Sequence, residues 1–533
     1  MKQYRYFIAL LLLLGVNSWT IGQYQSDGRD EKLAEISLPG NVQSWIDQEL
    51  ARAKIKTLMD YQSADFFRKD TSRVIGYLRG YHPEIGFSTG MIYAGNELTR
   101  EDYPLVVTIH PDGRFEVDLP MNYPLYTYLA FQGRTSTFYI EPGQSLAMII
   151  DRNDANAPTR FLGPTARINS ELASIQVKSP PYSELMEKAK NVTPDEFKRS
   201  HLATWKANSE ELERQLSSRK FTPQTRTIVR NELALDHAAY MFDYVSYRKY
   251  QQQQNPQNAP LDSTFYDFLH QLPLNDPSLL IPESFGTFVN RYEYDEAFWR
   301  AYSLSNEKER PANIARELLI WELKDSILSS YYKLQSSLIH EISKTRSFGS
   351  FSGSRERAHQ LLTALTPGIS HPYLRLELQR IFESNFATSQ STAYSLAPGK
   401  AAEIFKKIVE PHRDKVVFVD FWATTCRPCI AFIKKHKTER LKLETHQDFD
   451  FVFITSTNES PEANYLDFIK ENELEHSYRI SSDNFRYLRQ LFKFNAIPHY
   501  VLVGKDGTIL NDNFPMYVAF DERLRNRILE QFD

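Results

Sequence analysis

Both cysteines of this 533-residue chain lie in one short stretch, DFWATTCRPC, at residues 420–429. The run KVVFVDFWA, which overlaps its start, is rich in β-branched and aromatic residues and is typical of a strand buried on both faces. The residues that follow, CIAFIKKHKTERL, have helical spacing. The sequence therefore predicts a strand, a tight turn and a helix, with Cys426 and Cys429 in the first turn of the helix.

The position of the cysteines predicts a reactive thiol. If the helix begins at about Arg427 or Pro428, unpaired N–H groups and the helix dipole favour a thiolate at Cys426. Arg427 adds a nearby positive charge, and Pro428 suits a first turn, where its missing N–H has no helical partner. Cys426 would then attack a disulfide and Cys429 would resolve the mixed disulfide, or the same steps would run backwards. These residues do not give the direction of exchange.

Two other roles for the pair stay open at this point. A structural zinc site needs about four ligands, and the chain has no second Cys-x-x-Cys to complete one. The other alternative is an inert pair in a core.

Elsewhere, GSFSG has Phe351 where a hydrolase needs serine, and HEISK, which begins at His340, ends in Lys344 where a zinc protease needs histidine. We expect His340 to be an ordinary helix histidine, and we expect no metal or cofactor.

The length and composition predict a globular protein of roughly three domains. Hydrophobic residues make up 41% of the chain and charged residues 24%, as in soluble globular proteins. The 63 Lys and Arg residues nearly balance 67 Asp and Glu residues, and no basic block stands out. Without such a block to neutralise phosphates, nucleic acid is not expected as a partner.

The N-terminus has the pattern of a secretory signal peptide over residues 1–22. Lys2 and Arg5 precede an apolar run from Phe7 to Val16, and small and polar residues follow up to Gly22. The run is too short to cross a membrane, which takes about 20 residues, and no later stretch is long and apolar enough. We therefore expect an extracytoplasmic, for instance periplasmic, protein without a membrane span after cleavage.

Changes of pattern along the chain predict its domains. After a lead-in segment, short alternating runs with a turn at residues 111–113 suggest a small antiparallel β-sandwich, and helical periodicity then predicts an all-α region that includes a long helix ending near Leu338. The last part alternates strands and helices and then has a hairpin, so we expect a mixed α/β sheet, with Ser460 and Pro461 capping one helix. The expected ranges are 23–71, 72–152, 159–390 and 398–533.

Two motifs in the last range resemble those of thioredoxin-like proteins. The stretch VVFVDFWATTCRPC resembles the family's active-site strand, turn and helix. The downstream NAIPHYVLVGKDG, at residues 495–507, resembles its second motif, in which Ile or Thr precedes a cis-proline and a β-hairpin follows. The resemblance covers about a quarter of the chain and implies a thioredoxin-like fold for residues 398–533.

The resemblance also implies roles for individual residues. Cys426 would be the attacking thiol and Cys429 the resolving thiol. Pro498 would be the cis-proline beside the pair, and the backbone of Ile497 would meet a bound client. Asp420 would be the buried acid that accepts the proton of Cys429, although a strand-end Asp can also serve only as a hydrogen-bonding group. The resemblance places Trp422 under the site, and we count it with Ile497 and Arg427 as substrate-binding residues.

Two departures from the family pattern leave the partner and the reduction potential open. Thr425 stands where the family usually has Trp, and Arg427-Pro428 replaces Gly-Pro between the cysteines. His499, directly after the proline, is expected at an exposed rim. A peroxidase on the same fold would need Thr and Pro where this chain has Ala423 and Val419, which argues against peroxide reduction.

The predicted export, the C-terminal domain and the long N-terminal extension together resemble the TlpA-like branch of extracytoplasmic thiol-disulfide oxidoreductases. This resemblance implies a protein that reduces disulfides of exported proteins and exchanges electrons with a partner redox protein. The alternative is a non-catalytic scaffold whose thioredoxin-like domain only docks a partner.

Overall fold

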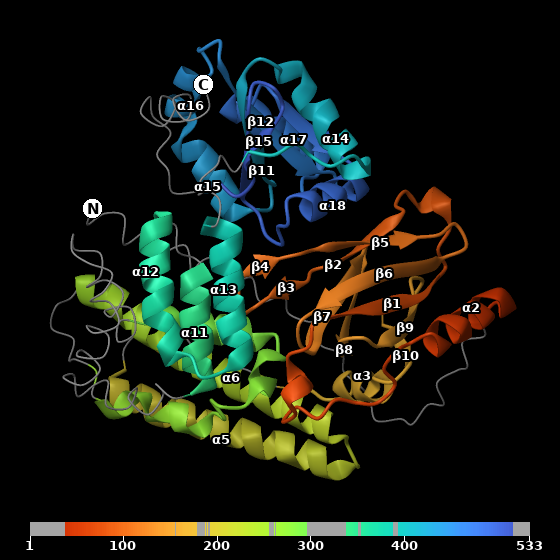
Figure 1. Ribbon diagram of the computed structural model, residues 1–533, viewed down its shortest axis with the longest axis vertical. Helices are drawn as coiled ribbons and strands as arrows, with labels where there is room; N and C mark the ends of the chain where they lie inside the picture. The colour runs from red at the N-terminus through yellow and green to blue at the C-terminus, as the bar shows by residue number, and fades with distance from the viewer. Residues whose placement is uncertain are drawn as a thin grey trace.

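The computed structural model describes residues 38–154, 156–177, 187, 189, 192–254, 261, 263–295, 337–349, 353–386 and 393–514. It contains a β-rich region, a helical region and a C-terminal α/β region, which confirms the predicted fold class (Figure 1). The expected signal peptide, Phe351 and nearly all of the predicted long helix lie outside the described residues. Among the described helices, none has the length and apolarity needed to cross a membrane.

The β-rich region is built on one curled sheet. Its strands are hydrogen-bonded in the order β10-β9-β1-β6-β5-β2-β7-β8, and the β1–β9 pair is parallel while the other pairs are antiparallel. Residues 141–144 join β8 directly to β9, although these strands stand near opposite ends of that order. The sheet must therefore bend back on itself, and it forms one continuous sheet where a sandwich of antiparallel strands was expected.

The strands and helices of this region have the following bounds: α2 (Gly40–Ala51), β1 (Asp70–Arg79), β2 (Thr89–Ile92), β3 (Gly95–Asn96), β4 (Glu101–Asp102), β5 (Leu105–Ile109), β6 (Arg114–Met121), β7 (Leu125–Phe131), β8 (Arg134–Ile140), β9 (Ser145–Asp151), β10 (Arg160–Leu162) and α3 (Ala166–Leu172). The strands β3 and β4 form a small separate hairpin. Alternation along the strands turns side chains such as Val74, Phe115 and Met148 into an apolar core inside the curl.

The helical region shares its core with the β-rich region. Its helices are α5 (Pro194–Ser218), α6 (Pro223–Gln254), α7 (Ser284–Tyr294), α11 (Leu338–Gly349), α12 (Arg355–Leu365) and α13 (Pro372–Phe386). Phe66, Tyr123 and Tyr139 of the β-rich region belong to the same buried cluster as these helices. The buried Arg346 of α11 also pairs with Glu293 of α7 at 2.9 Å and with Glu97 at 2.6 Å. These contacts make the two regions one packed body.

The C-terminal region is a five-stranded mixed sheet between two layers of helices. The strand order is β13-β12-β11-β14-β15, with β11, β12 and β13 parallel and β14 and β15 antiparallel to their neighbours. Helices α15, α16 and α17 contribute to the core on one face, and α14 and α18 to the core on the other. The bounds are α14 (Lys400–Val409), β11 (Val416–Phe421), α15 (Arg427–Lys435), α16 (Lys437–Leu443), β12 (Phe449–Ser456), α17 (Glu462–Asn472), β13 (Ser477–Ile480), α18 (Ser482–Leu491), β14 (His499–Val503) and β15 (Ile509–Asn511).

Helix α18 docks the C-terminal region on strands β2 and β5, as Figure 1 shows. The Asp483 carboxylate accepts hydrogen bonds from the backbone N–H of Ser88 at 2.7 Å and from the Thr89 hydroxyl at 2.6 Å. Arg486, one turn later, donates to the carbonyl of Thr89 at 3.0 Å. Gln490, a further turn on, accepts from the N–H of Val106 at 2.6 Å. These residues lie on one face of the helix, so the contact is a repeated one along its length.

The buried histidines His201 of α5 and His237 of α6 make stability depend on pH. Their facing ring nitrogens lie 3.2 Å apart. Burial lowers the pKa of His201 to about 4, and burial with the neighbouring His201 lowers the pKa of His237 to about 3. Because an unfolded histidine has a pKa of about 6.5, the unfolded chain takes up protons below that pH while the folded chain does not. The free energy of unfolding should therefore fall as the pH falls below about 6.5.

We expect a loss of about 2 kcal/mol per histidine between pH 7.5 and pH 5, measured by urea unfolding. His237→Gln should reduce the difference between the two pH values, whereas His82→Gln, at an exposed histidine, should leave it unchanged. Equal pH dependence in wild type and His237→Gln would contradict this prediction.

Candidate active site

The two cysteines lie where the predicted strand, turn and helix place them. Strand β11 ends at Phe421, and α15 begins at Arg427 with Cys426 as its N-cap, so the predicted start of the helix is confirmed. Cys426 and Cys429 form a disulfide with their Cα atoms 5.3 Å apart. The Sγ atom of Cys426 accepts a hydrogen bond from the N–H of Cys429 at 3.2 Å. Such a bond stabilises negative charge on this sulfur when the disulfide is reduced.

Burial distinguishes the two sulfurs. Cys426 is partly exposed, whereas Cys429 is 1% exposed and packs in the core beneath α15. A client sulfur from solvent can therefore reach Cys426 but not Cys429. Arg427, predicted to contact substrate, is exposed beside Cys426 at the first position of the helix.

The loop before β14 brings the predicted second motif to the disulfide. The peptide bond between Ile497 and Pro498 is cis, as the family resemblance implied. The carbonyl oxygen of Ile497 lies 3.7 Å from the Sγ atom of Cys426, and both Ile497 and Pro498 are partly exposed. The structure thus brings Cys426, Ile497 and Pro498 together at one surface.

Asp420 lies on the face of β11 that packs against α15. Alternation along the strand puts it on the same side as Phe418 and Trp422, in the core that also holds Cys429. Its side chain is buried, and its Oδ1 atom has no hydrogen-bond partner among the described residues. Burial raises the pKa of Asp420 well above its usual value. Directly opposite on β14 is Tyr500, whose hydroxyl also lacks a partner in the described part of the chain.

Trp422 is fully buried and packs against Phe468 of α17 with ring centroids 5.0 Å apart. It belongs to the apolar cluster that also contains Cys429, but the expectation that it binds substrate is wrong. A side chain without exposed surface cannot contact a client, so Trp422 acts through packing.

The His499 prediction is also wrong, since this side chain is not at an exposed rim. It is 8% exposed and stacks on Phe494, with ring centroids 4.3 Å apart. Burial lowers the pKa of His499 to about 4. Side chains alternate along β14, so His499 pairs with Phe421 on the opposite face of the sheet from Tyr500 and Asp420.

His340 is a buried histidine of α11 whose Nδ1 lies 3.2 Å from the hydroxyl of Tyr292.

Ser460 supports the active-site turn instead of capping α17. That helix begins at Glu462 with Pro461 as its N-cap, and no side chain caps it. The hydroxyl of Ser460 accepts a hydrogen bond from the N–H of Thr424 at 2.9 Å and lies 2.7 Å from the hydroxyl of Thr455. Ser460 therefore holds the turn that precedes Cys426.

A buried arginine, Arg489 of α18, joins the two loops beside the disulfide. Its guanidinium donates to the Glu459 carboxylate at 2.9 Å and to the carbonyl of Asn495 at 2.8 Å. The carbonyl of Glu459 in turn accepts from the hydroxyl of Thr425 at 3.1 Å. Sequence reasoning missed this residue because its partners come from separate segments and form no local motif.

The cis-proline loop is also tied to the β-rich region. Asp102 of the β3–β4 hairpin accepts from the backbone N–H of Asn495 at 2.9 Å and from its side-chain amide at 3.1 Å. The same amide donates to the carbonyl of Ala94 at 3.0 Å. The backbone two residues before Ile497 is therefore held by a segment almost 400 residues earlier in the chain.

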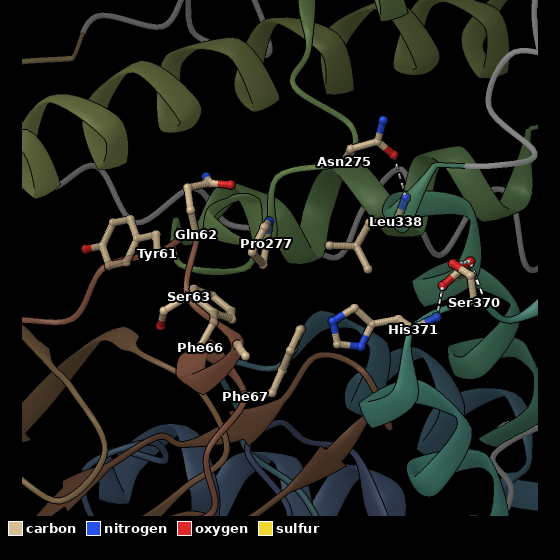
Figure 2. A pocket seen from close by; sticks show the side chains of 12 residues that line it. Tyr61, Gln62, Ser63, Phe66, Phe67, Asn275, Pro277, Leu338, Ser370 and His371 are labelled. Carbon is tan, nitrogen blue, oxygen red and sulfur yellow. Dashed lines mark hydrogen bonds between the residues drawn. The ribbon is translucent and has the colours of Figure 1, made fainter.

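A separate pocket of about 460 Å³ lies between the β-rich and helical regions (Figure 2). Several of its polar groups are already hydrogen-bonded. The carboxylate of Glu341 accepts from the backbone N–H groups of Ser370 at 2.8 Å and His371 at 3.0 Å, and the side chain of Asn275 accepts from the N–H of Leu338 at 3.1 Å. We assign no function to this pocket because these groups need no ligand to satisfy them.

Comparison with known proteins agrees with this geometry over part of the chain. The sequence profile of a family described as thioredoxin-like matches residues 414–509. No curated protein sequence matches the chain significantly.

Similar solved structures cover about a quarter of this chain. They include the thioredoxin domain of a thiol-disulfide oxidoreductase from Bacteroides vulgatus, which is 17% identical and matches 24% of this chain and 84% of its own with a TM-score of 0.20. An exposed lipoprotein thioredoxin from Streptococcus pneumoniae is 19% identical, with coverages of 22% and 87% and a TM-score of 0.19. A secreted thiol-disulfide isomerase from Corynebacterium glutamicum is 16% identical, with coverages of 19% and 62% and a TM-score of 0.17. The profile match, together with the geometry of the site, shows that residues 414–509 form a thioredoxin-like domain within a longer chain.

Proposed function

We propose that the protein is an exported thiol-disulfide oxidoreductase that reduces protein disulfides through a dithiol cycle of Cys426 and Cys429. One observation carries this proposal: the partly exposed sulfur of Cys426 lies at a helix N-terminus, beside the carbonyl of Ile497, while Cys429 is buried behind it. An inert structural disulfide has no need of this difference in access. Export is supported by the basic and apolar N-terminal sequence.

The cycle follows from the order in which the sulfurs can be reached. The Cys426 thiolate attacks a client disulfide, one client sulfur leaves as a thiolate, and a mixed disulfide forms. Cys429 then gives its proton to Asp420 and attacks the Sγ atom of Cys426, and the second client sulfur leaves. The client has gained two electrons, and the protein is left with the disulfide described above. A partner redox protein must supply two electrons to restore the dithiol.

The surface next to Cys426 suits an extended protein segment as client. Ile497 is partly exposed there, and backbone hydrogen bonds recognise a strand without selecting its side chains. Arg427 lies at the same surface and would favour acidic or polar client residues. With the long extension before residue 398, these features support placement in the TlpA-like branch.

The reduction potential of the Cys426–Cys429 pair tests the direction of the reaction. We expect a value of about −270 mV, that of thioredoxin, measured by equilibration with dithiothreitol or glutathione and alkylation of free thiols. A value of about −120 mV, that of DsbA, would instead make the protein an oxidant. If the pair formed no reversible disulfide, the enzyme proposal would be overturned in favour of a docking scaffold.

The replacement Cys429→Ser should trap clients. Without the resolving thiol, the mixed disulfide at Cys426 persists, so incubation with a disulfide-bonded test protein should give a covalent complex on non-reducing gels. Dithiothreitol should release the complex. The matched variant Cys426→Ser should form none, and a complex of equal yield there would show that Cys429 is the attacking residue instead.

The replacement Asp420→Asn should separate activity from stability. Loss of the proton acceptor should slow release of the mixed disulfide by about 10²-fold near pH 7, measured by stopped-flow reduction of a test protein. Because folding raises the pKa of Asp420, its ionised form costs stability above pH 4, and the variant should unfold at a higher urea concentration. Unchanged release kinetics would contradict a role for Asp420 in proton transfer.

The replacement Asn495→Ala should weaken client binding more than the chemistry. It removes the side-chain hydrogen bonds that hold the cis-proline loop to Asp102 and Ala94. We expect the KM for a protein disulfide to rise several-fold while the reduction potential stays the same. Asn41→Ala, at an exposed asparagine of α2, is the control. If the reduction potential changed together with the KM, a role limited to positioning would be contradicted.

A further inference from the structure

Three potential metal ligands meet at the end of the C-terminal sheet opposite the disulfide. His412 lies just before β11, Asp450 is near the start of β12, and His476 lies just before β13. These strands are parallel, so their starts share one edge of the sheet, whereas Cys426 follows the other end of β11. One ligand atom from each side chain can be chosen so that all lie within 4.8 Å of one another.

The donor atoms face one another closely. The Nδ1 atom of His412 lies 2.8 Å from the carboxylate of Asp450, and the Nε2 atom of His476 lies 3.4 Å from its other oxygen. The two imidazole rings have centroids 4.6 Å apart. Two histidine nitrogens and one carboxylate oxygen are a common ligand set for zinc, with water completing the tetrahedron. Zinc needs ligand distances of about 2.0–2.2 Å, which small rotations of these side chains would provide.

Neighbouring groups already orient the ligands. The other ring nitrogen of His412, Nε2, lies 3.2 Å from the hydroxyl of Tyr478, and this contact holds Nδ1 toward Asp450. The backbone N–H of Phe451 donates to the Asp450 carboxylate at 2.9 Å. Metal-bound histidines and carboxylates are held by such outer contacts. His412 and Asp450 are buried, and the side chain of His476 is 33% exposed, so an ion can enter from that side.

A lysine competes for the same carboxylate. The ammonium of Lys415 lies 3.2 Å from the Asp450 oxygen that faces His412. An ion network of Lys415, Asp450 and the two histidines is therefore the alternative explanation of the cluster. Lys415 is 38% exposed on a flexible side chain, so it can turn into solvent when a cation takes its place. The two explanations predict different effects of removing this lysine on zinc binding.

We propose that His412, Asp450 and His476 bind one divalent transition-metal ion of the zinc type. The ion joins the segments before β11 and β13 to β12 and stabilises the edge of the sheet away from the disulfide. The site lies outside the exchange machinery, so the proposal does not depend on the proposed function.

Isothermal titration of the full-length protein with zinc chloride tests this proposal. The disulfide is kept oxidised, because free thiols of Cys426 and Cys429 would themselves bind zinc. We expect one ion per chain, and His476→Gln should weaken binding at least tenfold. Lys415→Gln should bind zinc more tightly than wild type, since the competing ammonium is gone. His82→Gln, at an exposed histidine away from this cluster, is the matched control and should leave binding unchanged.

Thermal unfolding gives a second readout. Zinc should raise the midpoint of wild type and of Lys415→Gln but not that of His476→Gln, because an ion that binds only the folded state stabilises it. Circular dichroism without metal verifies that each variant is folded. Absence of stoichiometric binding in wild type, or equal binding by wild type and His476→Gln, would overturn the proposal. Unchanged or weaker binding by Lys415→Gln would also count against it and favour the ion network.

Discussion

The candidate active site depends on the burial of β11 between two layers of helices. Every residue from Val416 to Phe421 is buried, and alternate side chains enter separate apolar clusters on the two faces of the sheet. A shift by one residue would exchange these two sets of side chains, so the register of the strand is strongly specified. The position of the turn after Phe421, and with it the position of Cys426, is therefore fixed with respect to both layers of helices.

The regions before residue 393 take part in the architecture of the site. Helix α18 carries Asp483, which binds strand β2, and Arg489, which joins the cis-proline loop to Glu459. The carbonyl of Glu459 in turn bonds the turn before Cys426. Asp102 of the β-rich region holds that loop from the other side. Because the β-rich and helical regions share one core, both are connected through Asp102 to the cis-proline loop.

Asp420 illustrates a conflict between stability and chemistry. A carboxyl group without a hydrogen-bond partner for its Oδ1, among the described residues, is costly in an apolar core. Burial raises the pKa of Asp420 toward that of a thiol, as the proposed proton transfer from Cys429 requires. The neighbouring residues of the strand are apolar, so Asp420 is the one polar side chain in Val416–Phe421.

The sequence by itself determined the local elements of the site: the buried strand, the helix that begins at Arg427 and the position of the cysteine pair follow from short-range pattern, and the cis-proline follows from the family resemblance. It also predicted the mixed sheet and the order of the three regions. Only the tertiary structure decided which face His499 occupies, that Trp422 is fully buried, that Ser460 supports a turn, and that the β-strands form one curled sheet. The contacts of Arg489 and the meeting of His412, Asp450 and His476 were likewise invisible in the sequence. They join segments far apart along the chain, and such proximity arises from strand order and packing, not from local spacing.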